Sequence, residues 1–213
     1  MEYSMRLVQK WICALGQALV SLENELTELD SKLGDGDLGL SMARGGEALC
    51  YTVENSRAET LDGLFLECAA AFNQAAPSTL GTLLSMGLRA AGKSLTGCTC
   101  LTEMQIVKLP RIMADEIAAR GKARIGDKTI LDALLPYAET LEAEYKEYGD
   151  LPRAAAAASA AATKGAQGTA GMSARIGRAR WLGDRNSGYP DGGAVLCSRI
   201  AEFFSVAGAE AQE

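Results

Sequence analysis

The stretch Leu-Asp-Ser-Lys-Leu-Gly-Asp-Gly-Asp-Leu-Gly, residues 29–39, separates two segments of helical periodicity and carries three closely spaced aspartates. Asp30, Asp35 and Asp37 follow a D-x4-D-x-D spacing, with two glycines between them that allow a sharp turn. Like charges this close repel one another unless a cation or strong donors compensate them. Because carboxylate oxygens are ligands that Mg²⁺ prefers, we predict a Mg²⁺ site at these three residues.

Two other interpretations are a solvated acidic loop and a calcium site. Apart from Lys32, no lysine or arginine lies among the three acids, and helical segments flank the loop on both sides, which argues against a merely solvated loop. An EF-hand does not fit, because counting from Asp35 puts Gly39 at position 5 and Gly46 at position 12. The spacing therefore favours Mg²⁺ with one side open to a phosphate.

Composition predicts an ordinary globular protein. The chain has 213 residues, of which 48% are hydrophobic and 23% charged, so we expect one domain over residues 1–213 with a frayed tail at 207–213. The net charge of −6 argues against nucleic acid or an anionic membrane as partner. The apolar segment 11–20 is too short to cross a bilayer and continues with helical spacing, so we expect a cytoplasmic protein.

Histidine is absent, which excludes Ser-His-Asp and Cys-His catalysis, imidazole zinc sites and a phosphohistidine carried by this chain. The six cysteines are scattered, and Cys98 and Cys100 form the only close pair. A single C-x-C is weak evidence for metal or redox chemistry. Buried or half-buried thiols in a reducing compartment are the expected state.

Helical periodicity dominates, and no stretch shows sustained strand alternation. We expect Ser78 to cap a helix and Pro110 to kink or break one. The Ala-rich run 154–162 indicates either close helix packing or simply a strong helix former. The predicted helices cover about 4–28, 39–53, 60–74, 79–95, 102–120, 129–148, a segment from Pro152 through the Ala-rich run, and 194–206. Eight helices without strands predict an all-α bundle or closed helical barrel.

Two segments could contact phosphate. Gly87–Ser94 formally fits the P-loop pattern, but its flanking residues continue a helix and no strand precedes it, so the helix is favoured. Gly81 and Thr82 lie at a predicted helix start, where backbone N–H groups and the helix dipole favour an anion, although such a pair is also common in helix caps. The hydroxyl of Thr82 could donate to a phosphate oxygen.

The segment from Gly165 to Gly193 is rich in Gly, Arg, Ser and Asp, and is too long for a plain connection. Its arginines, including Arg178, suit phosphate because a guanidinium donates two parallel hydrogen bonds. We therefore expect a binding loop or lid here.

Taken together, the motifs resemble those of the nucleotide-binding L subunit of bacterial dihydroxyacetone kinase. They occur in the family's order over nearly the whole chain: Leu29–Asp37, Gly81-Thr82, Gly126-Asp-Lys-Thr-Ile-Leu-Asp132, Gly177-Arg-Ala, Leu182-Gly-Asp-Arg185 and Asp191-Gly-Gly-Ala194. The resemblance implies a barrel of eight antiparallel helices with the nucleotide at one end.

The same resemblance implies a ligand set. Two Mg²⁺ ions would be held by Asp30, Asp35 and Asp37 and would bridge the phosphates of ADP or ATP. The residues expected at the nucleotide are Leu38, Gly39, Leu40, Ser41, Gly81, Thr82, Gly126, Thr129, Arg178, Asp191, Gly192 and Gly193.

The chain departs from the family pattern at two places. Many members carry His directly after the third aspartate, where this chain has Leu38, and an apolar side chain cannot donate to phosphate. In the late turn, Tyr189 and Gly192 replace the His and Pro of many members. Substrate or partner can therefore differ from those of the plain dihydroxyacetone enzyme.

The implied function is phosphoryl transfer to a small keto-sugar held by a partner K subunit (DhaK-like), which binds the sugar through its own histidine. The donor is ATP or a phosphocarrier protein (DhaM-like) that recharges bound ADP. The alternative is a nucleotide-loaded regulatory or adapter subunit without catalysis of its own, and a bare helical scaffold ranks third.

Overall fold

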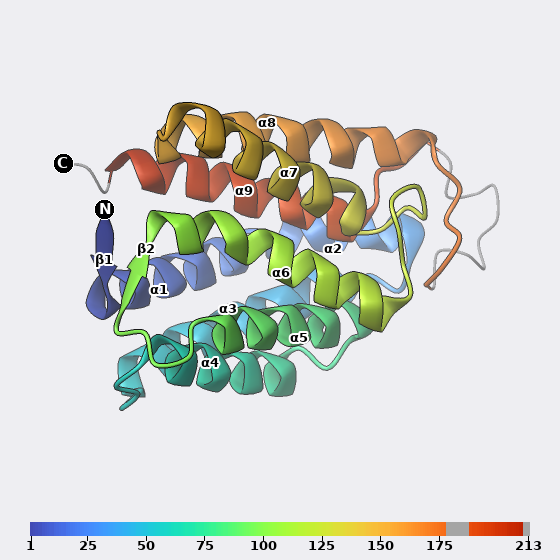
Figure 1. The fold of residues 1–213 in the computed structure, drawn as a ribbon. Helices are drawn as coiled ribbons and strands as arrows, with labels where there is room; N and C mark the ends of the chain where they lie inside the picture. Colours follow the sequence, from blue (N-terminus) through green and yellow to red (C-terminus); the bar gives the residue numbers. More distant parts are fainter. Residues whose placement is uncertain (178–187, 211–213) are drawn as a thin grey trace.

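The computed structural model describes residues 1–177 and 188–210, which are almost entirely helical (Figure 1). Its helices are α1 (Met5–Ser21), α2 (Glu23–Leu33), α3 (Leu38–Asn55), α4 (Leu61–Ala75), α5 (Thr79–Ser94), α6 (Glu103–Gly121), α7 (Leu131–Tyr148), α8 (Leu151–Gly168), the short 3₁₀ helix η1 (Thr169–Gly171) and α9 (Gly192–Glu210). Two short strands, β1 (Glu2–Ser4) and β2 (Cys100–Thr102), complete the described elements.

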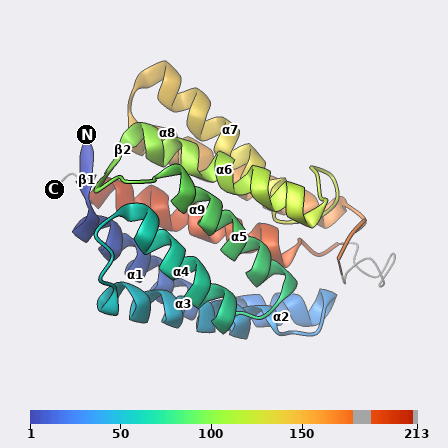
Figure 2. The same cartoon turned by 60° about the horizontal axis from the view of Figure 1, so that its bottom comes forward.

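The helices form a closed ring. Each one packs against its neighbours in the order α1, α3, α4, α5, α6, α7, α8 and α9, and α9 returns to α1 and α2 (Figure 2). Because α2 continues α1, the described part of the chain has eight helical positions in the ring, as predicted. Neighbouring helices run antiparallel, so the predicted all-α antiparallel barrel is confirmed.

The first predicted helix is wrong in detail. The segment expected as one helix over 4–28 is divided at Leu22, and α2 then extends to Leu33. At the division the Ser21 hydroxyl donates to the carbonyl of Ala18 at 2.7 Å, a local hydrogen bond that competes with regular helix geometry. Consequently Asp30 lies in the last turn of α2 rather than in a loop.

The absence of strands was also a wrong expectation. Strands β1 and β2 pair antiparallel, with Tyr3 opposite Leu101. Each has three residues, which is too short for strand alternation to appear in a sequence. Pro110 lies inside α6 without ending it, so the expected break does not occur.

Polar caps fix several helix ends. Ser78 caps α5 as predicted, because its hydroxyl accepts a hydrogen bond from Gly81 N at 3.0 Å. Thr102 and Gln105 form a reciprocal capping box at the start of α6. The Asp150 carboxylate accepts from Arg153 N at 3.0 Å and starts α8. These caps supply partners for N–H groups that the helix itself leaves unpaired.

The interior has one large apolar cluster and two smaller ones. Leu26, Met42 and Leu64 are among the fully buried side chains of the large cluster, which the N-terminal half of the chain supplies together with Leu196 of α9. The second cluster joins α6, α7, α8 and α9 and contains many alanines. Buried alanines of α8 recur on one face, and Gly165 packs directly on the backbone of Asp132. Close helix packing is therefore confirmed for the Ala-rich run.

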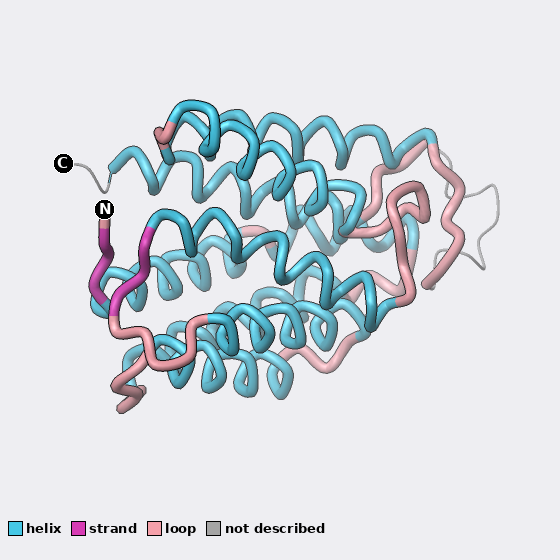
Figure 3. The backbone as a smooth tube through the Cα atoms, viewed as in Figure 1, coloured by secondary structure: helices cyan, strands magenta, loops and turns pink. Residues whose placement is uncertain are grey.

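Antiparallel order places alternate loops at the same end of the ring. The connections α2–α3, α4–α5, α6–α7 and α8–α9 lie at the end opposite the N-terminus (Figure 3). The N-terminus, the β1–β2 pair and the last turn of α9 lie at the other end (Figure 1). Every site residue that the sequence predicts, where the structure describes it, lies at the end that carries the α2–α3, α4–α5, α6–α7 and α8–α9 connections. Among residues 1–177 and 188–210, no helix is long and apolar enough to cross a membrane.

Candidate functional site

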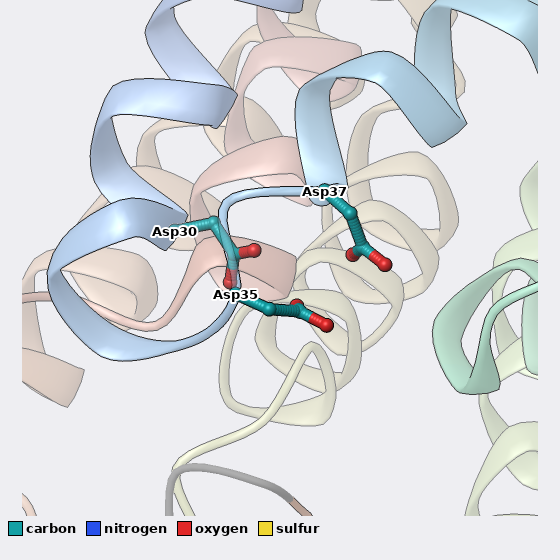
Figure 4. A group of neighbouring side chains, drawn as sticks. All are labelled: Asp30, Asp35 and Asp37. Atoms are coloured by element: carbon teal, nitrogen blue, oxygen red, sulfur yellow. The ribbon is translucent and has the colours of Figure 1, made fainter.

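Three carboxylates meet in the α2–α3 connection (Figure 4). Asp30 comes from the last turn of α2, Asp35 from the connection itself, and Asp37 from the residue before α3. One oxygen of each lies within 4.8 Å of the others, and Asp35 and Asp37 are exposed. Within the described residues this is the one group of three potential metal ligands that comes so close. The predicted convergence of these aspartates is thus present.

Glycines make this geometry possible. A Cβ on Gly34 would lie 2.6 Å from the Asp30 carboxylate, so any side chain there would displace the acid. Gly36 has φ +76°, a left-handed conformation that a residue with a side chain adopts only with strain. Gly39 packs against the backbone of Glu23 and the hydroxyl of Thr27. The glycines therefore hold α2 and α3 close enough for the three acids to converge.

Leu38 is the first residue of α3 and is buried. Its N–H donates to the Asp30 carboxylate at 3.4 Å, which orients that acid. Its side chain belongs to the large apolar cluster and reaches Gly192, where an added Cβ would lie 2.6 Å from Leu38 Cδ2. The side chain of Leu38 thus faces the interior, and only its backbone lies along the acidic loop.

The other residues of the first α3 turn divide between interior and surface. Gly39 is buried, whereas Leu40 is 41% exposed, unusual for a leucine. Ser41 is half-buried, and its N–H donates to the carbonyl of Asp37 at 2.9 Å. The start of α3, with its partial positive charge, therefore lies next to the acidic cluster.

Helix α5 begins at the same end. The N–H of Gly81 donates to the Ser78 hydroxyl, and that of Thr82 donates to the Ser78 carbonyl at 2.9 Å. Gly81 is buried and packs on the carbonyl of Ala76. Both N–H groups thus complete the helix cap, whereas the half-buried Thr82 side chain carries the hydroxyl.

The α6–α7 connection is organised by a buried carboxylate. Asp132 accepts hydrogen bonds from Gly126 N at 2.6 Å and from Thr129 N at 2.7 Å. Gly126 has φ +88° and Lys128 φ 62°, so two left-handed residues turn the chain around Asp132. The N–H groups of Gly126 and Thr129 therefore build the loop itself.

A buried lysine joins this loop to the α8–α9 segment. Lys128 is only 2% exposed, and its ammonium donates to the carbonyl of Met172 at 3.1 Å. Burial lowers the pKa of Lys128, while the nearby Asp191 carboxylate opposes that shift. Asp127 adds a second connection, because its carbonyl accepts a hydrogen bond from Arg175 N at 3.2 Å.

Asp191 precedes α9 and caps it. Its carboxylate accepts from Ala194 N at 2.8 Å, and its own N–H donates to the Thr169 hydroxyl at 2.8 Å. The pKa of Asp191 is raised to about 6, chiefly by burial and also by the Asp132 carboxylate, while the hydrogen bond from Ala194 N and the Lys128 ammonium oppose this rise. Hydrogen bonds with Ala194 and Thr169 therefore hold Asp191 in place, although burial disfavours its charged form.

Gly192 and Gly193, at the start of α9, lie against residues of the other three connections. Gly192 lies against Leu38 at the start of α3. A Cβ on Gly193 would lie 3.3 Å from Ile130 in the α6–α7 region and 3.4 Å from Leu80 at the start of α5. The structure thus brings the predicted residues of four separate connections to one end of the ring.

The profile of the DAK2 domain family matches residues 32–205. The chain belongs to the DAK2 domain family. The match includes the Asp35–Ser41 stretch, the start of α5, the α6–α7 connection and the Asp191 turn. Arg178, which the sequence also predicts at the nucleotide, lies outside the described residues.

Two relatives of this DAK2 domain are informative. A D-erythrulose kinase of Mycolicibacterium smegmatis is 36% identical over 200 residues, which cover 91% of this chain and 34% of that protein. The PEP-dependent dihydroxyacetone kinase, ADP-binding subunit DhaL, of Escherichia coli is 29% identical over 210 residues, covering 99% of this chain and 100% of that subunit. The chain therefore spans about a third of the first relative and the full length of the second.

Solved structures agree with the DAK2 fold. The native crystal structure of the dihydroxyacetone kinase of C. freundii superposes with a TM-score of 0.75 at 25% identity, over 96% of this chain and 35% of that chain. A structure of the C. freundii enzyme in complex with AMP-PNP and Mg²⁺ gives a TM-score of 0.74 at 24% identity, over 97% of this chain and 35% of that chain.

The sequence did not identify three residues that organise the site of this DAK2 domain. Lys128 and Asp132 belong to a motif that the family resemblance includes, but nothing in the sequence indicated that they are buried. Thr169 gave no signal at all. Gly126, two residues before Lys128, marks a turn, since glycine readily adopts a positive φ, but it does not show that the lysine side chain is buried.

Proposed function

We propose that this DAK2 domain is the nucleotide- and Mg²⁺-binding subunit of a dihydroxyacetone kinase-type phosphotransferase. The observation that supports it most is the convergence of Asp30, Asp35 and Asp37 within 4.8 Å, next to the start of α3. The name of the E. coli relative, an ADP-binding subunit that this chain matches over its full length, agrees with a nucleotide ligand.

The acidic cluster fits a hard divalent cation. All three of its potential ligands are carboxylate oxygens, and two of the three acids are exposed. Opposite ligands on one Mg²⁺ are about 4.2 Å apart. The carboxylate oxygens of the cluster lie within 4.8 Å of one another, which is close to that distance. When bound, Mg²⁺ would neutralise phosphate charge during transfer. We propose two ions, since three carboxylates and the phosphates of a nucleotide provide enough oxygen ligands for both.

The chain's own groups would position the nucleotide. The dipole of α3 at Gly39 to Ser41 favours a phosphate, and the Thr82 hydroxyl can donate to it. The turn Asp191–Gly193, held by Thr169, and the loop Gly126–Thr129, held by Asp132, would border the nucleoside. Arg178 would supply a bidentate donor to phosphate. These groups bind and orient, which is most of what phosphoryl transfer requires from a protein.

The acceptor sugar belongs to a partner in this proposal. The chain contains no histidine and therefore cannot hold a ketone through an imidazole. We propose a K-type subunit that carries dihydroxyacetone, erythrulose or a related small ketose. The relative from M. smegmatis is a D-erythrulose kinase about three times as long as this chain, which is consistent with a separate acceptor-binding part. The donor is ATP or a phosphocarrier that recharges ADP.

All six cysteines are free thiols, a state typical of proteins in a reducing compartment such as the cytoplasm, where we expect this subunit to act.

The test measures the thermal unfolding midpoint with ADP or ATP, with Mg²⁺ or with EDTA. A ligand at about 100 times its dissociation constant stabilises the folded state by about 2.7 kcal/mol. We expect a Mg²⁺-dependent rise in the wild type that is lost in an Asp35→Asn, Asp37→Asn variant. Glu28→Gln is the matched control, because Glu28 is an exposed acid of α2 outside the cluster.

Turnover is tested separately by adding a K-type subunit loaded with ketose. Binding without turnover with any such subunit would favour the adapter function over the kinase. If neither nucleotide raises the midpoint of nucleotide-free wild-type protein, the proposed site is wrong.

A further inference from the structure

Helices α1 and α3 approach each other closely at two glycines. A Cβ on Gly16 would lie 2.5 Å from the carbonyl oxygen of Gly46, so the two backbones touch. The helices run antiparallel (Figure 1). Cys13, one turn before Gly16, therefore faces Cys50, one turn after Gly46.

The two thiols are in direct contact. Cys13 Sγ lies 3.1 Å from Cys50 Sγ, and the Cys50 thiol also donates to the carbonyl oxygen of Cys13 at 3.0 Å. A disulfide requires a sulfur separation of about 2.05 Å, so the atoms need to approach by only about 1 Å. Both residues are half-buried, so an oxidant as small as hydrogen peroxide can reach their sulfur atoms.

The remaining cysteines have different surroundings. Cys68 and Cys197 are buried, and burial raises the pKa of each thiol to about 12. The sulfur of Cys98 accepts a hydrogen bond from the Gln105 amide at 3.3 Å. Close approach of two sulfurs across a helix pair is thus a feature of Cys13 and Cys50.

We propose that Cys13 and Cys50 form an oxidisable dithiol, which a peroxide converts into an intramolecular disulfide between α1 and α3. The Cys13 thiolate attacks a peroxide oxygen, the O–O bond breaks, and Cys13 becomes a sulfenic acid while hydroxide leaves and is protonated to water. The Cys50 sulfur then attacks the Cys13 sulfur, and a second water leaves with the thiol proton. Two sulfurs each lose one electron, and the peroxide gains two.

Burial raises the pKa of Cys50 to about 12, with the Cys13 thiol as the next cause, so Cys50 remains a thiol at neutral pH. The hydrogen bond from the Cys50 thiol to the Cys13 carbonyl oxygen also keeps the proton on Cys50, so we assign the first attack to Cys13 and the resolving step to Cys50. The resulting disulfide would close a loop that contains α2 and all three aspartates of the acidic cluster. It would therefore limit how far α1 and α3 can separate on either side of this loop.

The experiment treats the reduced full-length chain with hydrogen peroxide, alkylates the remaining thiols under denaturing conditions and digests with trypsin. Cleavage after lysine and arginine releases peptides 11–32 and 45–57, each with a single cysteine. We expect these two peptides to be linked and two of the six thiols to escape alkylation. The thermal midpoint of the oxidised protein should exceed that of the reduced one.

Cys13→Ser and Cys50→Ser should each abolish the link and the rise in midpoint, whereas Cys100→Ser, the matched control, should retain both. Either serine variant suffices if the other does not fold. The proposal is wrong if all six thiols can still be alkylated after a peroxide treatment that fully oxidises free glutathione. It is equally wrong if the link joins Cys98 to Cys100 or occurs only between chains. Neither outcome depends on nucleotide binding, so this test is independent of the proposed function.

Discussion

Two residues that depart from the family pattern lie in contact. Leu38 and Gly192 stand where the resemblance described above implies a histidine and a proline. In this structure the Leu38 side chain points inward, and its terminal methyl occupies the space where a side chain at position 192 would begin. At Tyr189, where the resemblance also implies a histidine, the ring centroid lies 5.8 Å from the ammonium of Lys32 on α2. The departures are therefore physically related through the α2–α3 region.

This contact predicts that Gly192→Ala destabilises the protein. Gly192 has no positive φ, so the cost should come from the 2.6 Å approach to Leu38 Cδ2 and should be about 1–3 kcal/mol. Urea unfolding of Gly192→Ala, Leu38→Ala and the double variant measures the coupling. The penalty at position 192 should nearly vanish when Leu38 is alanine. Gly168→Ala, with nothing near its Cβ position, is the control and should be neutral or slightly stabilising. Additive effects would contradict the contact.

The raised pKa of Asp191 predicts that the free energy of unfolding depends on pH. Its pKa is raised to about 6 in the folded chain, against about 3.9 when unfolded, so the native state binds this proton more tightly. The protonated Asp191 carboxyl therefore adds to the free energy of unfolding below about pH 4, and this contribution is lost as the pH rises through about 6. The stability of Asp191→Asn relative to wild type should therefore increase by at most about 3 kcal/mol between pH 4 and 7.

The measurement is urea unfolding of both proteins across this range. Asparagine is a suitable replacement because its side-chain oxygen can still cap α9. Lys128→Met should move the change to higher pH, since Lys128 lowers the pKa of Asp191. A difference that stays constant with pH would mean that the carboxyl group is not desolvated in the folded protein.

At the scale of elements, most helices were predictable because each buries an apolar stripe that repeats with helical period. Strands β1 and β2 were not, since their three-residue length hides any alternation. The acidic cluster was predictable because its members lie within eight residues of one another. The contacts of Lys128 with Met172 and of Thr169 with Asp191 span 44 and 22 positions and depend on the closed ring, which no local pattern encodes.

Packing of α1 on α3 predicts a strong effect of one methyl group. In Gly46→Ala the new Cβ would collide with the carbonyl of Gly16, a backbone atom that cannot move alone. We expect a loss of about 1–3 kcal/mol in unfolding free energy, despite the better helix propensity of alanine. Chemical denaturation checks this value against Gly168→Ala. A stabilised Gly46→Ala protein would show that the two helices do not approach as closely as described.

At the scale of the whole molecule, the ring has two ends that differ in their residues. The loop end combines three convergent carboxylates, the starts of α3, α5 and α9, and the buried Lys128. The opposite end carries the β1–β2 pair and the rings of Tyr3 and Trp11, which are tilted by 57° to each other with centroids 5.0 Å apart. Because antiparallel helices place alternate connections at the same end, a ligand can contact four connections there without altering the other end.

This separation predicts a one-sided pattern of hydrogen exchange when ADP and Mg²⁺ bind. Amides in residues 30–41, 79–82, 126–132 and 188–193 should exchange more slowly, because a bound ligand suppresses local opening of the loops that it joins. Amides of β1, β2 and the α7–α8 connection should change little. Exchange measured by mass spectrometry on the wild type and on Asp35→Asn, Asp37→Asn decides the question. In the variant the protection should disappear from all four segments together. Protection confined to one segment would contradict a site shared by the whole loop end, and equal protection at both ends would indicate general stabilisation instead.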